Sequence, residues 1–300
     1  MRQIDRRIEA FRTLGARFQH EAIAPLILVH KIDPSLFGAL VCAARIYMDA
    51  AALNSWTPPG DILPLYDSGQ VYAVTPAGMI VPKRTSWLAF NAVVRVFSDI
   101  MQAMGFGDLI DSWHVPLNVR FKSSLLADTS AGRPHATEQP HSDSWAGEST
   151  ESVTVHIPLM GDTGRNYLRM FYPDEDLFEE AWLGSRDDYR DGHDVLPHYR
   201  ALDYVIPLGS VALIDFATLH ATTRNPGSGA RVSIDTTFTL KKRDMSERIH
   251  PWREGERASD EVLRSIGTTR VFYFPDAPDA QVRVDGFRHP TRMRIVEVGP

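Results

Sequence analysis

The sequence predicts a mainly β protein of the α+β class, with N-terminal helices packed outside an antiparallel barrel or sandwich. Two observations lead to this fold class. After about residue 115, short segments alternate apolar and polar residues and are separated by turn-forming residues. Before that point, apolar residues recur at helical spacing. Helices first and strands later favour helices on the outside of one β core.

The individual elements are expected as follows. The helices should cover residues 4–18, 36–53 and 86–104, because Pro58-Pro59-Gly60 stops the second and a glycine follows the third. Alternation and β-branched residues predict strands over residues 117–125, 152–159, 204–206, 211–215, 231–240, 271–274 and 293–298.

Length and composition predict one domain over residues 1–300. A chain of 300 residues with 43% hydrophobic and 23% charged residues is typical of a globular protein with a sizeable core. We divide it into a mainly helical part (1–114), a β core (115–240) and a C-terminal extension with extra strands (241–300). The sequence leaves the oligomeric state open.

Charge and cysteine content exclude several classes of protein. The net charge of −6 argues against nucleic-acid binding, which needs a basic face. The single cysteine, Cys42, forms neither an internal disulfide nor a zinc-thiolate cluster, so a reducing, cytoplasmic location is expected. The sequence has no signal-peptide core and no apolar run of the roughly 20 residues that a membrane span needs. The expected partner is a small molecule.

Residues 173–194 form an acidic insertion with nine carboxylates and two arginines. One interpretation is a solvated surface loop. The other is a lid that favours a cationic substrate, with Asp187, Asp188 and Asp191 as the carboxylates concerned.

The segment Pro140-His141-Ser142-Asp143 offers two metal ligands. In an extended backbone, residues i and i+2 share a face, so His141 and Asp143 can direct a nitrogen and an oxygen at one point. These are two of the three ligands of the two-histidine, one-carboxylate facial triad that binds non-haem Fe(II). With 11 His and 38 acidic residues, a single His-x-Asp/Glu is expected by chance, so the pair alone also fits a polar surface pair.

Two later segments favour the metal site over the polar surface pair. His220 ends the apolar run that begins at Val211, and a turn rich in Gly and Pro follows it. Arg231 and Ser233 then share one face of a strand, which we expect to face the barrel interior. A buried arginine requires an anion, and a carboxylate bound by two parallel hydrogen bonds is the natural partner. Taken singly, His220 also fits a core histidine and Arg231 an exposed arginine.

Together these segments resemble the Fe(II)/2-oxoglutarate-dependent dioxygenase superfamily. Over residues 115–240 the sequence is most similar to the phytanoyl-CoA-dioxygenase-like branch of this superfamily. Three segments carry this similarity: HSDSW, PLGSVALIDFATLHATTRN and RVSIDTTF. The resemblance implies a double-stranded β-helix (jelly-roll, cupin-like) core and an enzyme that needs Fe(II), 2-oxoglutarate and O2. It implies that His141, Asp143 and His220 bind iron and that Arg231 and Ser233 bind 2-oxoglutarate. Because halogenases of the superfamily carry a small residue at the carboxylate position, Asp143 implies hydroxylation or a related oxidation.

Further candidates come from neighbouring segments. Arg120 and Lys122 alternate with apolar residues, so both can point into the barrel and bind 2-oxoglutarate or an anionic substrate group. Loop positions around the motif and on the following strand supply candidate substrate contacts: Arg133, His135, Trp145, Asn166 and Arg169.

Two other interpretations stay open. The same three ligands could serve a cupin-like isomerase or a zinc hydrolase, neither of which requires Arg231 or Ser233. A catalytically silent jelly-roll binding protein would be expected to lack a ligand. We expect a hydroxylase of specialised metabolism, while the sequence leaves the substrate and the attacked carbon open.

Overall fold

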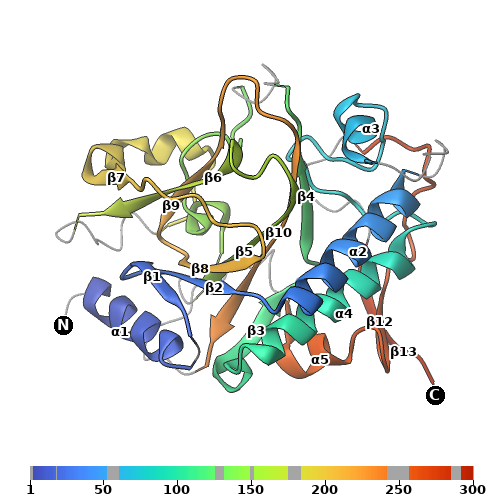
Figure 1. The fold of residues 1–300 in the computed structure, drawn as a ribbon, viewed down its shortest axis with the longest axis horizontal. Helices are drawn as coiled ribbons and strands as arrows, with labels where there is room; N and C mark the ends of the chain where they lie inside the picture. Colours follow the sequence, from blue (N-terminus) through green and yellow to red (C-terminus); the bar gives the residue numbers. More distant parts are fainter. Residues whose placement is uncertain are drawn as a thin grey trace.

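Two antiparallel sheets lie against each other, and a separate two-stranded sheet lies apart from them. The computed structural model describes residues 3–17, 19–52, 61–125, 132–148, 152–174, 184–241, 257–284 and 292–299. The main sheet has the order β1 (Glu21–Ala24), β2 (Ile27–Lys31), β8 (Ser210–Asp215), β5 (Ser152–Gly161), β10 (Arg231–Leu240), β3 (Ile110–His114) and β11 (Arg257–Ser259), and β4 (Asn118–Lys122) also pairs with β10. The smaller sheet has the order β7 (Tyr199–Ala201), β6 (Asn166–Pro173) and β9 (Leu219–Arg224). This is a jelly-roll core, as expected (Figure 1).

The two faces of the long strands carry different chemistry. On β10, Val232, Ile234 and Phe238 pack into the large apolar cluster shared with the helices. The alternate residues Arg231 and Ser233 face the other way and are also buried. The barrel interior is therefore polar, while the apolar core lies between the main sheet and the helices.

Helices cover the outer face of the main sheet. α2 (Pro34–Ala51) and α4 (Trp87–Ala103) cross it side by side, and α5 (Asp260–Ser265) lies beyond α4 (Figure 1). The other helical elements are α1 (Gln3–Gly15), α3 (Leu63–Asp67), η1 (Gly107–Leu109), η3 (Asp143–Ala146) and η6 (Tyr189–His198). The two-stranded sheet consists of β12 (Arg270–Tyr273) and β13 (Arg294–Glu297). No helix among the described residues is long and apolar enough to cross a membrane.

The first residues of α2 show how the sequence sets a boundary. The Asp33 side chain accepts hydrogen bonds from the backbone N–H groups of Ser35 and Leu36, and Pro34 occupies the first turn. Capping satisfies donors that the helix itself leaves unpaired. The predicted helix over 36–53 is thus confirmed, with its start two residues earlier.

The strand predictions met different outcomes. Six of the predicted strands are present within a few residues of their expected bounds, but the strand over 204–206 is wrong. Tyr204 and Ile206 pack beside β2 and β8 as part of a small apolar cluster, so their apolar character reflects packing without strand pairing. Several strands were not predicted: β1, β2, β3, β6, β7, β9 and β11. Three of them, β1 to β3, lie in the part expected to be mainly helical.

Gly161 allows β5 and β10 to meet closely. Its φ is +87°, and a Cβ there would lie 2.2 Å from the carbonyl oxygen of Ala230. Only glycine tolerates both conditions. The close approach sets Arg231 opposite Gly161 in the pairing register, at the start of β10.

Candidate metal centre

The fold brings His141, Asp143 and His220 together. One potential ligand atom from each lies within 4.8 Å of the other two. Asp143 Oδ1 is 3.6 Å from His220 Nε2, and the two imidazole centroids are 4.4 Å apart. These atoms can hold one metal ion between them.

The backbone route to this cluster differs from the expected one. His141 pairs with His220 through two backbone hydrogen bonds of 3.0 and 2.8 Å, so the two histidines lie side by side. Asp143 is not on a strand but begins η3. His220 does not end β8; the chain first turns at residues 216–218, and His220 is the second residue of β9.

Both imidazoles are oriented by backbone carbonyls. The Nδ1 atom of His141 donates to the Gln139 carbonyl at 2.8 Å, and that of His220 donates to the Thr218 carbonyl at 3.2 Å. Each ring then presents the lone pair of Nε2, which is the form that binds a metal. Burial, reinforced by the neighbouring His220, lowers the pKa of His141 well below its usual value, so the neutral ligand form predominates at neutral pH.

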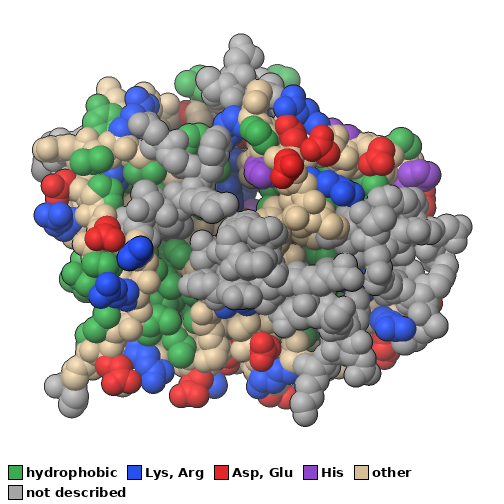
Figure 2. Space-filling view, turned by 180° about the vertical axis from the view of Figure 1, so that it is seen from behind, with side chains coloured by type: hydrophobic (Ala, Val, Ile, Leu, Met, Phe, Trp, Pro, Cys, Tyr) green, Lys and Arg blue, Asp and Glu red, His purple; other side chains and the backbone are tan. Residues whose placement is uncertain are grey.

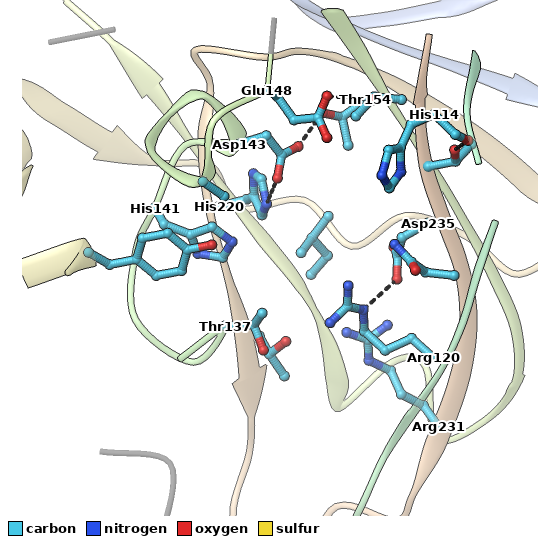
Figure 3. A pocket seen from close by; sticks show the side chains of 17 residues that line it. His114, Arg120, Thr137, His141, Asp143, Glu148, Thr154, His220, Arg231 and Asp235 are labelled. Atoms are coloured by element: carbon cyan, nitrogen blue, oxygen red, sulfur yellow. Dashed lines mark hydrogen bonds and ion pairs between the residues drawn. The ribbon is translucent and has the colours of Figure 1, made fainter. Parts of the chain in front are cut away.

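The carboxylate is oriented by a hydroxyl group. Thr154 on β5 donates a hydrogen bond from Oγ1 to Asp143 Oδ2. The other oxygen, Oδ1, is then the one directed toward His220 (Figure 3). A hydrogen bond from a residue that does not itself bind the metal commonly orients a metal ligand in this way.

The cluster opens into a cavity of about 150 Å³ inside the barrel. Arg120, Arg231 and Asp235 line the cavity at a distance from the two histidines, and His114 and Glu148 line other parts of its wall (Figure 3). The remaining lining residues are Asn118, Thr137, Ala146, Thr154, Leu168, Tyr189, Thr222, Thr236 and Thr237. Most of the lining residues thus carry a polar or charged group.

Arg231 is the decisive charged group in this cavity. Its side chain is 1% exposed, and it donates to Asn166 Oδ1 at 3.2 Å and to Ser233 Oγ at 3.1 Å. Among the residues that the structure describes, no carboxylate lies within 4.0 Å of its guanidinium. Burial lowers the pKa of Arg231 to about 10, although nearby Asp235 opposes this, so it remains charged at neutral pH.

Arg120 is paired differently. It donates from Nε to Asp235 Oδ2 at 3.0 Å and from Nη1 to the Ala77 carbonyl at 3.0 Å. Asp235 also accepts from His156 and, at 3.2 Å, from Ser233. Burial would raise the pKa of Asp235, but His156 and the arginines outweigh it and hold that pKa far below its usual range. Asp235 therefore pairs directly with Arg120 and not with Arg231, so the end of the cavity that these three residues line carries one more positive than negative charge.

Lys122 lies on the same strand as Arg120 but does not line the cavity. Its Nζ donates to Thr137 Oγ1, to the Ala77 carbonyl at 3.2 Å and to Glu138 Oε1 at 3.4 Å. Burial lowers its pKa to about 7, against the opposing effect of Glu138. Its proposed contact with 2-oxoglutarate stays a prediction.

Asn166 lies next to Arg231 instead of lining the cavity. Besides accepting from Arg231, it donates from Nδ2 to the carbonyls of Lys122, Ser123 and Gly229. It is completely buried. The structure thus places it behind the guanidinium, as a residue that holds Arg231 in position.

The other candidate substrate contacts also lie outside the cavity lining. Arg133 is 3.7 Å from Glu138, His135 Nε2 interacts with the Arg186 carbonyl at 3.1 Å, and Arg169 lies over the Phe171 ring. Trp145 is buried in a small apolar cluster. Their roles in substrate binding stay predictions.

Tyr189 belongs to the site although the sequence analysis did not select it. Its ring stacks on that of His141, with centroids 4.2 Å apart and planes at 10°. It is the first residue of η6, whose N-terminus is capped by Asp188. Gly192 lets this segment approach closely, because a Cβ there would lie 2.6 Å from the Trp145 ring. The only sequence signal was an aromatic residue within an acidic stretch.

The described part of the acidic insertion has both surface and site contacts. Asp187, Asp188 and Asp191 do not line the cavity, and Asp188 pairs with Arg190. Residues 175–183 of the insertion lie outside the described residues.

Figure 2 shows a recess on the face opposite that of Figure 1, with histidine and basic side chains in its depth and acidic side chains gathered beside it. The preference for a cationic substrate stays a prediction.

Comparison with known proteins yields structural neighbours only. No family model matches the sequence, and no curated protein matches it. The structure is similar to that of the non-haem α-ketoglutarate-dependent epimerase SnoN from nogalamycin biosynthesis (13% identity over 94% of this chain and 98% of that chain, TM-score 0.39). It is also similar to the carbocyclase SnoK from the same biosynthesis (12%, 81% and 86%, 0.44) and to EctD from S. alaskensis with 2-oxoglutarate and 5-hydroxyectoine (14%, 92% and 87%, 0.42). Likenesses this distant assign neither a reaction nor a substrate to this chain.

Proposed function

We propose that this protein is an Fe(II)- and 2-oxoglutarate-dependent oxygenase of the phytanoyl-CoA-dioxygenase-like type, which hydroxylates or otherwise oxidises a C–H bond of a small molecule. One observation carries the proposal. The His-Asp-His cluster shares a cavity with a buried arginine that has no carboxylate partner among the described residues. A zinc hydrolase or a cupin-like isomerase needs the cluster but has no use for that arginine.

The donor set fits Fe(II). Two neutral imidazole nitrogens and one carboxylate oxygen form the facial arrangement that non-haem Fe(II) oxygenases use, and it leaves coordination positions open. His141, Asp143 and His220 would hold the ion. The hydrogen bonds to the carbonyls of Gln139 and Thr218 and from the Thr154 hydroxyl would keep these ligands oriented.

The positive charge at the Arg231 end of the cavity fits the distal carboxylate of a dicarboxylic oxo acid. Arg231 would pair with the distal carboxylate of 2-oxoglutarate, and Ser233 and Asn166 hold the guanidinium from behind. Arg120, fixed by Asp235, would add positive potential beside it. This pairing compensates a charge that is otherwise costly to bury.

When bound, Fe(II) and the oxo acid together reduce O2, release CO2 and succinate, and oxidise the substrate. The residues of this chain bind and orient the reactants within a partly closed cavity. Tyr189 covers one side of His141 and keeps bulk water from that ligand.

The cavity wall indicates a polar substrate. Ala146 and Leu168 are its aliphatic lining residues, whereas Glu148, His114 and several threonines surround them. An acyl chain would make few aliphatic contacts on such a wall and would desolvate charged groups without offering them hydrogen bonds. We therefore propose a small polar substrate, without a fatty-acyl site, and a role in specialised metabolism.

The test is an anaerobic titration of the protein with Fe(II) and then 2-oxoglutarate, monitored by the visible charge-transfer band of the chelate. We expect a band that requires both components and is absent from H220A, together with succinate formation once O2 and a polar substrate mixture are added. Iron binding without a band would reject the oxo acid and favour the isomerase. Turnover of ester or amide substrates with Zn²⁺ would favour the hydrolase. Absence of metal binding would favour the silent binding protein.

A further inference from the structure

The turn between β8 and β9 contacts both segments that carry the metal ligands. The carbonyl of Phe216 accepts a hydrogen bond of 2.7 Å from Ser142 Oγ. Ser142 is the residue between His141 and Asp143. At the other end of the turn, the carbonyl of Thr218 orients the His220 ring. Residues 216–218 thus fix one ligand segment relative to the other.

This turn is held by a residue that is distant in the sequence. Arg7 of α1 donates from Nε to Asp215 Oδ1 at 2.9 Å and from Nη2 to Asp215 Oδ2 at 2.5 Å. Asp215 ends β8 and also accepts the backbone N–H of Ala217 at 3.0 Å. The Arg7 guanidinium lies 3.7 Å from the centroid of the Phe216 ring. The Arg7 side chain therefore contacts both Asp215, which precedes the turn, and Phe216, the first residue of the turn.

The ion pair between Arg7 and Asp215 is buried and has a defined geometry. Both side chains are 1% exposed. Two parallel hydrogen bonds between a planar guanidinium and a carboxylate fix direction as well as distance. A surface pair with one contact would give no such constraint.

We propose that Arg7 is a positioning residue for the metal centre, which acts through Asp215 and the turn at residues 216–218. Its role is to hold the carbonyls of Phe216 and Thr218 where they set the separation of Ser142 from His220. This inference does not depend on the identity of the metal or on 2-oxoglutarate. It concerns the assembly of the three ligands alone.

The obvious variant needs a companion. Arg7→Met alone leaves Asp215 buried without its cation, and such a change can unfold a protein. In the double variant R7M/D215L both charges are replaced by apolar groups of similar size, which is often neutral for stability. Arg7→Lys keeps the charge but loses the fork geometry. All three leave His141, Asp143 and His220 in place.

The experiment uses Co²⁺ as the probe, because its d–d absorption reports coordination number and geometry. We expect R7K and R7M/D215L to show far-UV circular dichroism like that of the wild type. We expect their Co²⁺ dissociation constants to rise about tenfold, the lower end of the effect of changing groups around metal ligands, with an altered d–d spectrum. Arg12→Met, an exposed residue of the same helix paired with Glu9, is the matched control and should change neither.

A merely structural role predicts a different result. Leu40→Ala, a fully buried residue of α2 away from the cavity, serves as a variant that lowers the unfolding temperature without touching the turn. If R7K binds Co²⁺ with the wild-type constant and spectrum, the proposal is overturned. It is equally overturned if Leu40→Ala alters the spectrum as R7K does. Because the probe needs no oxo acid, failure here is separate from failure of the proposed oxygenase activity.

Discussion

Replacing Arg231 by methionine should strongly weaken 2-oxoglutarate binding while leaving the fold and the metal centre intact. In the structure this guanidinium is buried, donates to Ser233 and Asn166, and has no carboxylate within 4.0 Å among the described residues. The substitution therefore strands no buried anion of the protein. It removes two hydrogen bonds from a charged group, worth about 1.5–3 kcal/mol each, and it also removes the cost of a buried charge.

The expected loss of affinity is large. Truncating one partner of a buried charge pair between two molecules costs about 2–5 kcal/mol. At about 1.4 kcal/mol per factor of ten, this is a rise in the dissociation constant of 2-oxoglutarate of roughly 30-fold to 4,000-fold. The dissociation constant of Fe(II) measured without the oxo acid should stay within about twofold of the wild type, since Arg231 contacts none of the three ligands.

Anaerobic titration measures both constants, and thermal unfolding of the metal-free protein measures stability. Arg224→Met is the matched control, because Arg224 is a nearby arginine paired with Glu138 and does not line the cavity. It should leave 2-oxoglutarate binding unchanged. Wild-type affinity for 2-oxoglutarate in R231M would refute the assignment of the cavity to an oxo acid.

Three further outcomes are expected. Thr154→Val should weaken metal binding about tenfold, because Asp143 loses the hydrogen bond that orients it, and Thr154→Ser should restore the affinity; isothermal titration with Co²⁺ measures both. Tyr189→Leu removes the ring stacked on His141 and should alter the Co²⁺ d–d spectrum, and an unaltered spectrum would show that the stacking does not position the ligand. Burial would raise the pKa of Glu138, but Lys122 and two arginines outweigh it and lower that pKa to about 2. Its contribution to stability, at most about 3 kcal/mol, is therefore present above the unfolded-state pKa and lost as the pH falls from about 4.5 toward 2; Glu138→Gln should flatten this part of the unfolding profile.

The part of the site that could be predicted consists of residues whose chemistry shows in a short sequence window. His141 and Asp143 are two residues apart, and Arg231 and Ser233 are two residues apart on an alternating strand, so period-2 geometry describes each pair. His220 required more, since a resemblance supplied the link across the chain. The same window failed at residues 204–206, where apolar packing against β2 and β8 imitates a strand.

The remaining residues of the site could not be predicted, because their roles come from contacts between segments that are distant in the chain. In the sequence, Thr154 is one of several strand threonines; only the fold shows that it lies beside Asp143. Tyr189 reaches His141 from the acidic insertion. Arg7 meets Asp215 across 208 positions of sequence, so no residue near it in the chain indicates its partner. Strands β1 and β2 were missed for a related reason, since β2 pairs with the distant strand β8 and β1 pairs with β2.

The two faces of β10 have different roles, and this difference explains why the sequence of the strand indicates part of the site. Val232, Ile234 and Phe238 supply the apolar contacts with the helices, so the stability of the sheet depends mainly on that face. The inner face carries charged and hydroxyl groups that hydrogen-bond to one another, as in the contacts of Ser233 with Arg231 and Asp235. Substitutions on the two faces should therefore differ in kind: those on the outer face lower the free energy of unfolding, and conservative ones on the inner face change binding first. Arg231 and Asp235 of this inner face line the same cavity as the His-Asp-His cluster, so the polar face of β10 belongs to the site.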